Sequence, residues 1–209
     1  MIAETIRGVC RLMTARAGQR DEVRLDAAPR VYFANHASHL DFVVIWSALP
    51  PALRSRVRPV AGRDYWDRSR VRRFLSQRVF HAVLIERADA DRRLSPARAS
   101  IGAMTAALDR GHSLIVFPEG TRSIDGTIGP FRSGLYYLSR VRPDIDLVPV
   151  LLENTHRVLP KGQAIPLPAR CRVRFGRPIA GAAGEDKRTF LTRARGALLA
   201  MGGCDGRRH

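Results

Sequence analysis

The string from Asn35 to Asp41 combines residue types that can transfer a proton. It reads Asn-His-Ala-Ser-His-Leu-Asp, so a carboxylate follows His36 by five residues. Across a turn and a helix start, Asp41 can fix the tautomer of the imidazole and leave its other nitrogen to accept a proton. We therefore predict that His36 is a general base oriented by Asp41, and that His39 either lines the site or faces solvent. A structural histidine satisfied by Asp41 is the alternative.

The string Phe117–Ser123 follows a strongly apolar run and carries an acid, a glycine and an arginine. Gly120 permits a backbone conformation that other residues resist, and successive amides there can face an anion. The guanidinium of Arg122 adds a forked donor that suits phosphate. The string predicts an anion-binding turn; a surface turn with a Glu119–Arg122 ion pair is the alternative. Arg87, after another apolar run, is a second candidate for the same anion.

No serine or cysteine has the surroundings of a catalytic nucleophile, since Ser38 and Ser123 lack the glycine-flanked elbow of hydrolases. A base without its own nucleophile suits direct transfer, in which a hydroxyl of one substrate attacks a carbonyl of another. A zinc-dependent hydrolase using His36, His39 and Asp41 is an alternative class. No further ligand cluster supports it, so we expect no metal.

Apolar runs typical of strands alternate with helical patterns along the chain. Strands are predicted over residues 31–34, 57–61, 80–86, 112–117, 147–152 and 170–175. Helices are predicted over 38–49, with Ser38 as its cap, and over 64–78, 95–110, 131–141 and 187–201. This order predicts an α/β single domain with a mainly parallel or mixed central sheet flanked by helices. Both polar strings follow strands, so we expect them to share one site at the carboxyl ends.

Residues 2–17 are predicted to form a basic amphipathic helix that precedes this domain. Such a helix either packs on the domain or lies on a membrane surface. We expect three parts: an N-terminal helix and loop over 1–29, the main domain over 30–201 and a flexible tail over 202–209.

The formal net charge of +17 favours anionic partners such as nucleic acid, anionic lipid or a phosphorylated small molecule. Aromatic residues make up 7% of the chain and do not interleave with a basic stripe, which argues against nucleic acid. The three cysteines are scattered and fit a reducing compartment. No apolar stretch reaches about 18 residues and no secretory signal is evident, so we expect a cytoplasmic protein, peripheral on the inner face of the cell membrane.

Taken in order, these strings resemble the sequence blocks of the glycerolipid acyltransferases, most of all the bacterial 1-acylglycerol-3-phosphate acyltransferases. The matching strings are Asn35-His36 with Asp41, Arg87, Phe117–Ser123 and Val148-Pro149-Val150. The resemblance runs from about residue 30 to 178, with weaker similarity at 131–134 and 159–162.

The resemblance implies transfer of a fatty acyl group from acyl-CoA or acyl carrier protein to a lysophospholipid hydroxyl, by default that of lysophosphatidic acid. It implies that His36 is the base and Asp41 its partner. The phosphate-binding positions would be Arg87, Gly120, Thr121 and Arg122. The site-organising positions would be Asn35, Glu119 and Pro149, with Pro149 shaping the acyl-side wall. No cofactor beyond the acyl donor is implied.

Two positions depart from the family pattern. His81 lies six residues before Arg87, where the family often has a glycine, and Arg132 lies where it often has a lysine. A side chain at position 81 can reshape the acceptor pocket, so another lyso-lipid or a glycolipid acceptor is an alternative.

Family members also often carry membrane-spanning segments. No such segment is evident in this sequence, so the chain is expected to meet its lipid from the surface. The candidates for docking anionic phospholipid are the N-terminal helix and Arg68, Arg70, Arg72, Arg73 and Arg78.

Overall fold

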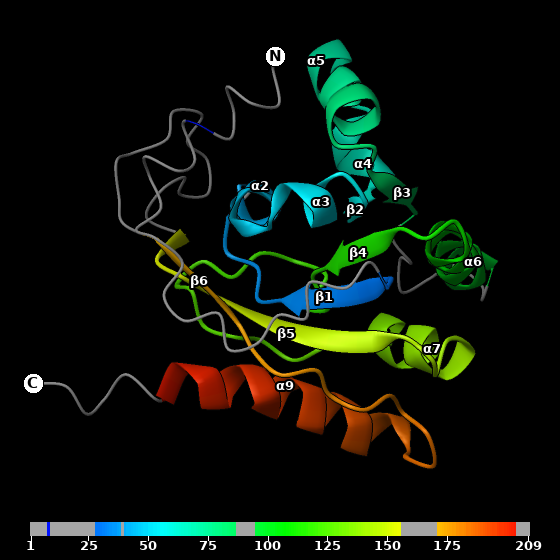
Figure 1. The fold of residues 1–209 in the computed structure, drawn as a ribbon, viewed down its shortest axis with the longest axis vertical. Coiled ribbons are helices and arrows are strands. Elements are labelled where there is room, and N and C mark those ends of the chain that lie inside the picture. Colours follow the sequence, from blue (N-terminus) through cyan, green and yellow to red (C-terminus); the bar gives the residue numbers. More distant parts are fainter. Residues whose placement is uncertain (1–7, 9–27, 39, 87–94, 156–170, 204–209) are drawn as a thin grey trace, which may run out of the picture.

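A six-stranded sheet with helices on both faces forms the centre of the protein (Figure 1). The computed structural model describes residues 8, 28–38, 40–86, 95–155 and 171–203. The strands are β1 (Arg30–Ala34), β2 (Val57–Gly62), β3 (Val83–Ile85), β4 (Ser113–Val116), β5 (Asp146–Glu153) and β6 (Arg172–Phe175). The predicted α/β class is therefore confirmed. The predicted helix over 2–17, apart from Gly8, lies outside the described residues.

The strand order is β3-β2-β4-β1-β5-β6, which makes β1 a central strand. It pairs in parallel with β4, Phe33 opposite Val116, and with β5, Ala34 opposite Val150. β2 and β3 extend the parallel part, and β6 alone runs antiparallel, beside β5. The sheet is thus mixed but mainly parallel, as predicted. The parallel register brings the loops after β1 and β4 to the same edge.

Alternate residues of β1 face two separate cores, because successive strand side chains point to opposite faces. Tyr32 and Ala34 belong to the core beneath α2 (Asp41–Ala48), while Val31 and Phe33 belong to the core on the other face. The first face is also covered by α3 (Pro51–Arg54), α4 (Arg63–Trp66) and the π-helix η1 (Leu75–Val79), while α5 (Arg70–Phe74), which lies between α4 and η1 in the sequence, projects away from the sheet. The second is covered by α6 (Ser95–Asp109), α7 (Gly134–Val141) and α9 (Lys187–Gly203).

The predicted helix over residues 64–78 is wrong as one element, because the chain breaks between α4 and α5. Ser69 is extended, with φ −147° and ψ 154°, and its hydroxyl accepts a hydrogen bond from the Arg72 backbone N–H at 3.2 Å. Such an N-cap starts a new helix rather than continuing an old one. The apolar stripe alone therefore could not locate the break.

Two further boundaries differ from the prediction for local reasons. The strand expected over 80–86 shrinks to Val83–Ile85, because Phe80 and Ala82 still donate backbone hydrogen bonds to the η1 turn and His81 has φ 48°. The helix expected over 131–141 begins at Gly134, because the Arg132 N–H donates instead to the Pro118 carbonyl at 2.8 Å.

Within the described ranges, no helix combines the length and the apolar character that crossing a bilayer requires.

Candidate active site

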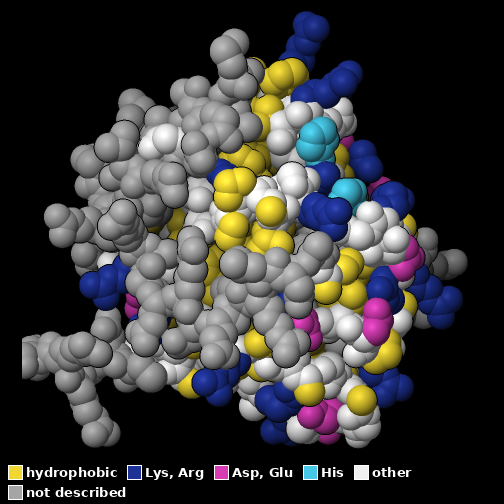
Figure 2. All heavy atoms as spheres, in the orientation of Figure 1, with side chains coloured by type: hydrophobic (Ala, Val, Ile, Leu, Met, Phe, Trp, Pro, Cys, Tyr) yellow, Lys and Arg dark blue, Asp and Glu magenta, His cyan; other side chains and the backbone are white. Residues whose placement is uncertain are grey.

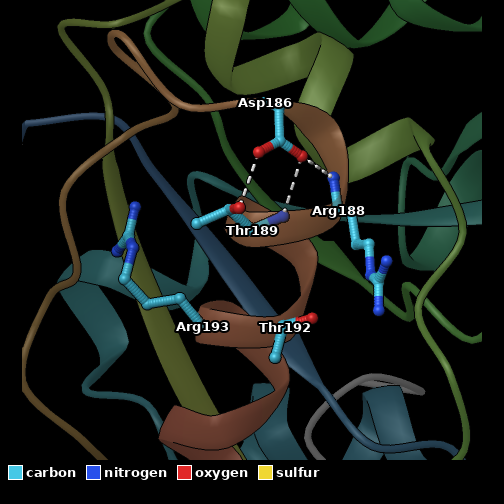
Figure 3. A pocket seen from close by; sticks show the side chains of 5 residues that line it. All are labelled: Asp186, Arg188, Thr189, Thr192 and Arg193. Atoms are coloured by element: carbon cyan, nitrogen blue, oxygen red, sulfur yellow. Dashed lines mark hydrogen bonds between the residues drawn. The ribbon is translucent and has the colours of Figure 1, made fainter.

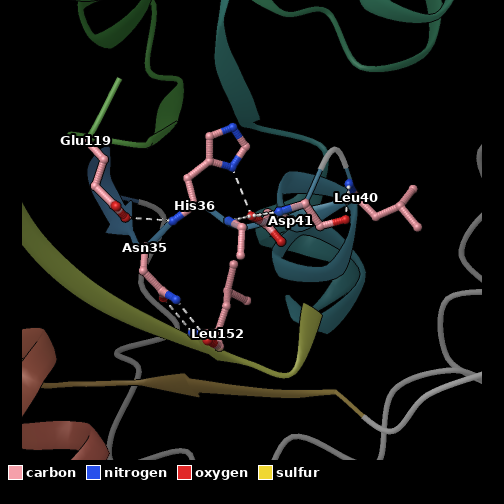
Figure 4. A network of polar contacts seen from close by, with 8 residues as sticks. Asn35, His36, Leu40, Asp41, Glu119 and Leu152 are labelled. Carbon is pink, nitrogen blue, oxygen red and sulfur yellow. Dashed lines mark hydrogen bonds and ion pairs between the residues drawn. The ribbon is translucent and has the colours of Figure 1, made fainter. Parts of the chain in front are cut away.

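Asn35 fixes the loop that leaves β1. Its side-chain amide donates to the Leu152 carbonyl at 2.9 Å, and its side-chain oxygen accepts from the Leu152 N–H at 2.8 Å. This pair of bonds continues the β1–β5 ladder past the end of β1 with a side chain in place of backbone (Figure 4). The loop therefore starts from a rigid point, which fits the site-organising role predicted for Asn35.

One oxygen of Asp41 gathers three donors from the same loop. Its Oδ2 lies 2.9 Å from Nδ1 of His36, 2.6 Å from the Ala37 N and 2.8 Å from the Ser38 N. Asp41 is fully buried and is the first residue of α2, where the helix dipole favours a negative charge. The prediction that Ser38 caps this helix is wrong: the N-cap is Leu40, and the Ser38 hydroxyl accepts a hydrogen bond from the Leu40 N–H at 3.3 Å.

This geometry assigns the protons on the His36 ring. Two backbone N–H groups already donate to Oδ2 of Asp41, so Nδ1 completes the set as a third donor and Nε2 carries the lone pair. Figure 4 shows Nε2 pointing away from the network. The ring also stacks on Phe117, with centroids 4.2 Å apart and planes 20° apart. The His36 ring is thus held with Nε2 as its accessible nitrogen.

Glu119 joins the two polar strings through its carboxylate. Its Oε1 accepts from the His36 backbone N–H at 2.8 Å, and its Oε2 accepts from the Gly129 N–H at 3.0 Å. The His36 carbonyl in turn accepts from the Ser123 N–H at 2.8 Å, so the second string holds both backbone groups of the base. Burial raises the pKa of Glu119, and the backbone hydrogen bonds from Gly129 and His36 offset part of that rise.

Gly120 gives the turn after β4 its shape. Its φ of 71° lies in the left-handed region, and its N–H donates to the Phe117 carbonyl at 3.1 Å. The side chain of Arg132 lies directly over it, because a Cβ at position 120 would come within 2.6 Å of the Arg132 Cδ. Nε of Arg132 donates to the Glu119 carbonyl at 3.2 Å. Arg132 therefore brings a cation to the turn, at the position where the family pattern often has a lysine.

The remaining predicted anion-binding residues lie at or beyond this turn. Thr121 is exposed, whereas Arg122 is partly buried and its Nη1 has no hydrogen-bond partner among the described residues. A buried guanidinium N–H without an acceptor suits an incoming anion. Arg87 lies outside the described residues, and its predicted role stays a prediction.

Pro149 takes a place that the sequence did not suggest. It is buried on β5, and its Cγ would lie 2.9 Å from a Cβ at Gly176, beside Met201 of α9. Within the described chain it packs between β5 and α9, on the sheet face opposite α2. Its predicted part in an acyl-side wall stays a prediction.

The metal alternative finds no support in the part of the chain that the structure describes, where no three His, Cys, Asp or Glu side chains gather to hold an ion. His39, one of its three suggested ligands, lies outside that part.

Sequence reasoning missed three positions that shape this site: Phe117 under the imidazole ring, Leu152 opposite Asn35, and Gly129. A Cβ at Gly129 would lie 3.0 Å from Oε2 of Glu119, so only glycine lets the backbone approach the carboxylate without a shift. The Gly129-Pro130 pair was a turn signal, but nothing in the sequence tied it to Glu119.

A shallow hollow of about 630 Å³ lies elsewhere, along the start of α9 (Figure 3). Its lining is Asp186, Arg188, Thr189, Thr192 and Arg193. Asp186 accepts from the backbone N–H groups of Arg188 and Thr189 and from the Thr189 hydroxyl, and the hydroxyl bond is the main cause of its lowered pKa. This is helix capping, and none of the predicted site residues lies there.

Comparison with known proteins identifies the class of this fold and site. A family model described as Acyltransferase matches residues 17–153, and the chain belongs to that family. The crystal structure of the 1-acyl-sn-glycerophosphate (LPA) acyltransferase PlsC from Thermotoga maritima matches the whole chain and 81% of its own length, with a TM-score of 0.74 and 18% identity. That likeness supports the fold.

Curated relatives carry the same enzyme name. The 1-acyl-sn-glycerol-3-phosphate acyltransferase of Limnanthes douglasii is 28% identical over 155 residues, covering 71% of this chain and 50% of the relative. The alpha form of that enzyme from Bos taurus is 27% identical over 177 residues, covering 83% of this chain and 58% of the relative. The chain thus spans about half the length of the curated relatives that it matches.

We expect Glu119→Gln to destabilise the fold by about 1–3 kcal/mol, because one buried backbone N–H would face an amide N–H₂ instead of an acceptor. The difference in free energy of unfolding between the wild type and the variant should narrow as pH rises. The pKa of Glu119 is higher in the folded state than its ordinary value of 4.5, so between these two pKa values the folded state binds more protons than the unfolded state. The wild type therefore loses stability as pH rises through this range, whereas the glutamine variant does not. Urea unfolding between about pH 4.5 and 7 measures both effects.

Glu86→Gln is the matched control, since Glu86 is exposed. Equal stability of the Glu119→Gln variant and the wild type at every pH would contradict the bridging role of Glu119.

Proposed function

We propose that this chain transfers a fatty acyl group from a thioester to the free hydroxyl of a lysophospholipid, with lysophosphatidic acid as the acceptor and phosphatidic acid as the product. The observation that carries the proposal is the His36 ring, held by Asp41 through Nδ1 with Nε2 left accessible. Family membership and the names of the curated relatives support it. No cofactor is required beyond the acyl donor.

The reaction runs in one direct transfer. Nε2 of His36 takes the proton of the acceptor hydroxyl as its oxygen attacks the thioester carbonyl. The buried charge of Asp41 stabilises the imidazolium that forms. The tetrahedral intermediate then expels the thiolate, which takes the proton from His36. Ester and free thiol are the products, and the base returns to its starting state.

The acceptor's phosphate is assigned to the turn after β4. Arg122 brings a partly buried guanidinium whose Nη1 has no hydrogen-bond partner among the described residues, and Gly120 and Thr121 bring backbone at a left-handed turn. Arg132 adds a second cation over Gly120. Arg87 is proposed as a further contact. Acyl-CoA and acyl carrier protein are both candidate donors, and we place the reaction at the cytoplasmic face of the membrane.

The first test is thioester cleavage by the purified protein given palmitoyl-CoA with and without lysophosphatidic acid. We expect free CoA to appear only with the acceptor, phosphatidic acid to form in equal amount, and His36→Ala to abolish both. Release by His36→Ala at the wild-type rate would overturn the base assignment. No release by the folded wild type, with either donor and a panel of lyso-lipids, would overturn the function.

Asp41→Asn should lower kcat by about 10²- to 10⁴-fold while the fold is kept. An asparagine can present its single oxygen to the three donors that meet Oδ2, so the loop geometry survives but the charge that stabilises the imidazolium is lost. Steady-state kinetics with circular dichroism measures both properties. A variant with wild-type kcat would contradict the role of Asp41.

Arg122→Ala should raise the KM for lysophosphatidic acid by about 10- to 100-fold and change kcat much less, because it removes charge-assisted bonds to the bound phosphate. Arg140→Ala is the control, since Arg140 is exposed on α7, across the sheet from α2. An unchanged KM for lysophosphatidic acid in Arg122→Ala would contradict the proposed phosphate-binding role of Arg122.

A further inference from the structure

The segment formed by α5 and η1 has one packed side and one exposed side. Leu75 and Val79 pack against the core beneath α2, and Phe80 lies in that core, 4.8 Å from the Phe42 ring by centroids. The other side carries two large apolar residues that remain uncovered: Val71 is 68% exposed and Phe74 is 49% exposed. They are three residues apart and so lie on the same side of the helix.

Arginines surround this apolar pair. The sequence from Arg68 to Phe80 contains five arginines and no acid. The acid just before it, Asp67, is already paired with Arg63 at 3.6 Å and Arg73 at 3.3 Å. Arg70 and Arg78 are exposed, and no ion pair to either is found within the described chain. We call Arg70, Val71, Phe74 and Arg78 the α5 face.

The α5 face is held rigidly on the body of the protein. Ser69 caps the start of α5, the Arg72 guanidinium lies 4.3 Å from the centre of the Tyr65 ring, and Trp66 packs edge-on against Phe42. Figure 1 shows α5 projecting beyond α4, away from the sheet. Figure 2 shows apolar side chains with Lys and Arg side chains around them at that end of the molecule.

Its position also relates it to the candidate active site. β2 is parallel to β1 and β4, so its carboxyl end at Gly62 lies at the sheet edge that bears His36 and Glu119. The chain passes directly from that end into α4 and then α5. The α5 face is therefore carried by the connection that leaves the same edge of the sheet.

We propose that the α5 face is a docking surface for anionic phospholipid membranes, with Val71 and Phe74 entering the boundary between headgroups and acyl chains and Arg70 and Arg78 contacting lipid phosphates. Exposed apolar side chains flanked by cations complement a surface that is negative outside and apolar beneath. This proposal rests on the proposed function, because an enzyme that acylates a lysophospholipid has to reach a membrane. It adds the surface through which the protein contacts that membrane.

The test is sedimentation of the full chain with vesicles of phosphatidylcholine containing 30% phosphatidylglycerol, or of phosphatidylcholine alone, both roughly at physiological ionic strength. Without lysophosphatidic acid or thioester, binding does not depend on the active site. We expect Val71→Ser/Phe74→Ser and Arg70→Gln/Arg78→Gln each to weaken binding to the anionic vesicles by about tenfold. Only the arginine pair should reduce the preference for anionic lipid.

Tyr137→Ser/Val141→Ser is the matched control for the apolar pair, because these residues are 46% and 55% exposed on α7. Arg140→Gln is the control for charge. Wild-type binding by both α5 variants would overturn the proposal and assign any membrane contact to another part of the chain. Equal losses in the control variants would also overturn it, since a general charge or solubility effect would then account for the result.

A second readout separates this proposal from the proposed function. The α5 variants should keep wild-type acyl transfer to a short-chain, monomeric lysophosphatidic acid and lose rate only on vesicle-borne acceptor. If a folded α5 variant lost acyl transfer to the monomeric acceptor as well as to the vesicle-borne acceptor, the α5 face would be part of the active site, contrary to the proposal. If the wild type transfers no acyl group but binds vesicles through this face, the proposed function fails and the docking surface stands.

Discussion

The candidate site depends on one buried carboxylate, that of Glu119, which ties the loop after β4 to the loop after β1. Its two oxygens accept the backbone N–H groups of His36 and Gly129, and the Ser123 N–H closes the loop on the His36 carbonyl. Hydrogen bonds to an ionised acceptor contribute about 1.5–3 kcal/mol each, so the two bonds offset part of the burial cost that raises the pKa of Glu119. The base is therefore positioned through its backbone as well as through its ring.

The parallel sheet brings Glu119 within hydrogen-bond distance of the His36 backbone. His36 and Glu119 are 83 residues apart in sequence, but β1 and β4 are neighbours in register, so their carboxyl-end loops meet without any long reach. On the other side of β1, Asn35 extends the pairing with β5 by a side-chain amide. His36 thus follows a central strand that is fixed on both sides, which gives the candidate site the rigid positioning that direct transfer between two bound substrates would require.

Much of the fold could be predicted because its signals are local. The apolar runs of β1, β4 and β5 indicated the strands, and the five-residue spacing from His36 to Asp41 indicated the contact between these two residues. The predicted helix boundaries that were wrong depend on a hydrogen bond to another loop or on a single N-cap residue. The bond between Arg132 and Pro118 delays α7, and Ser69 divides a helix whose apolar stripe is continuous. No period in the sequence encodes either effect.

The candidate site contains both satisfied and unsatisfied buried polar groups. Both oxygens of Glu119 and both polar atoms of the Asn35 side chain have protein partners, and these residues hold the loops. Nη1 of Arg122 and the Ser123 hydroxyl oxygen are buried with no partner in the described part of the chain. A buried polar atom without a partner costs about 1–3 kcal/mol, and Oδ1 of Asp41 is in the same condition. The Arg122 and Ser123 atoms lie on the turn whose Ser123 N–H donates to the His36 carbonyl, so an incoming hydrogen-bond partner there would lie next to the loop that bears the imidazole.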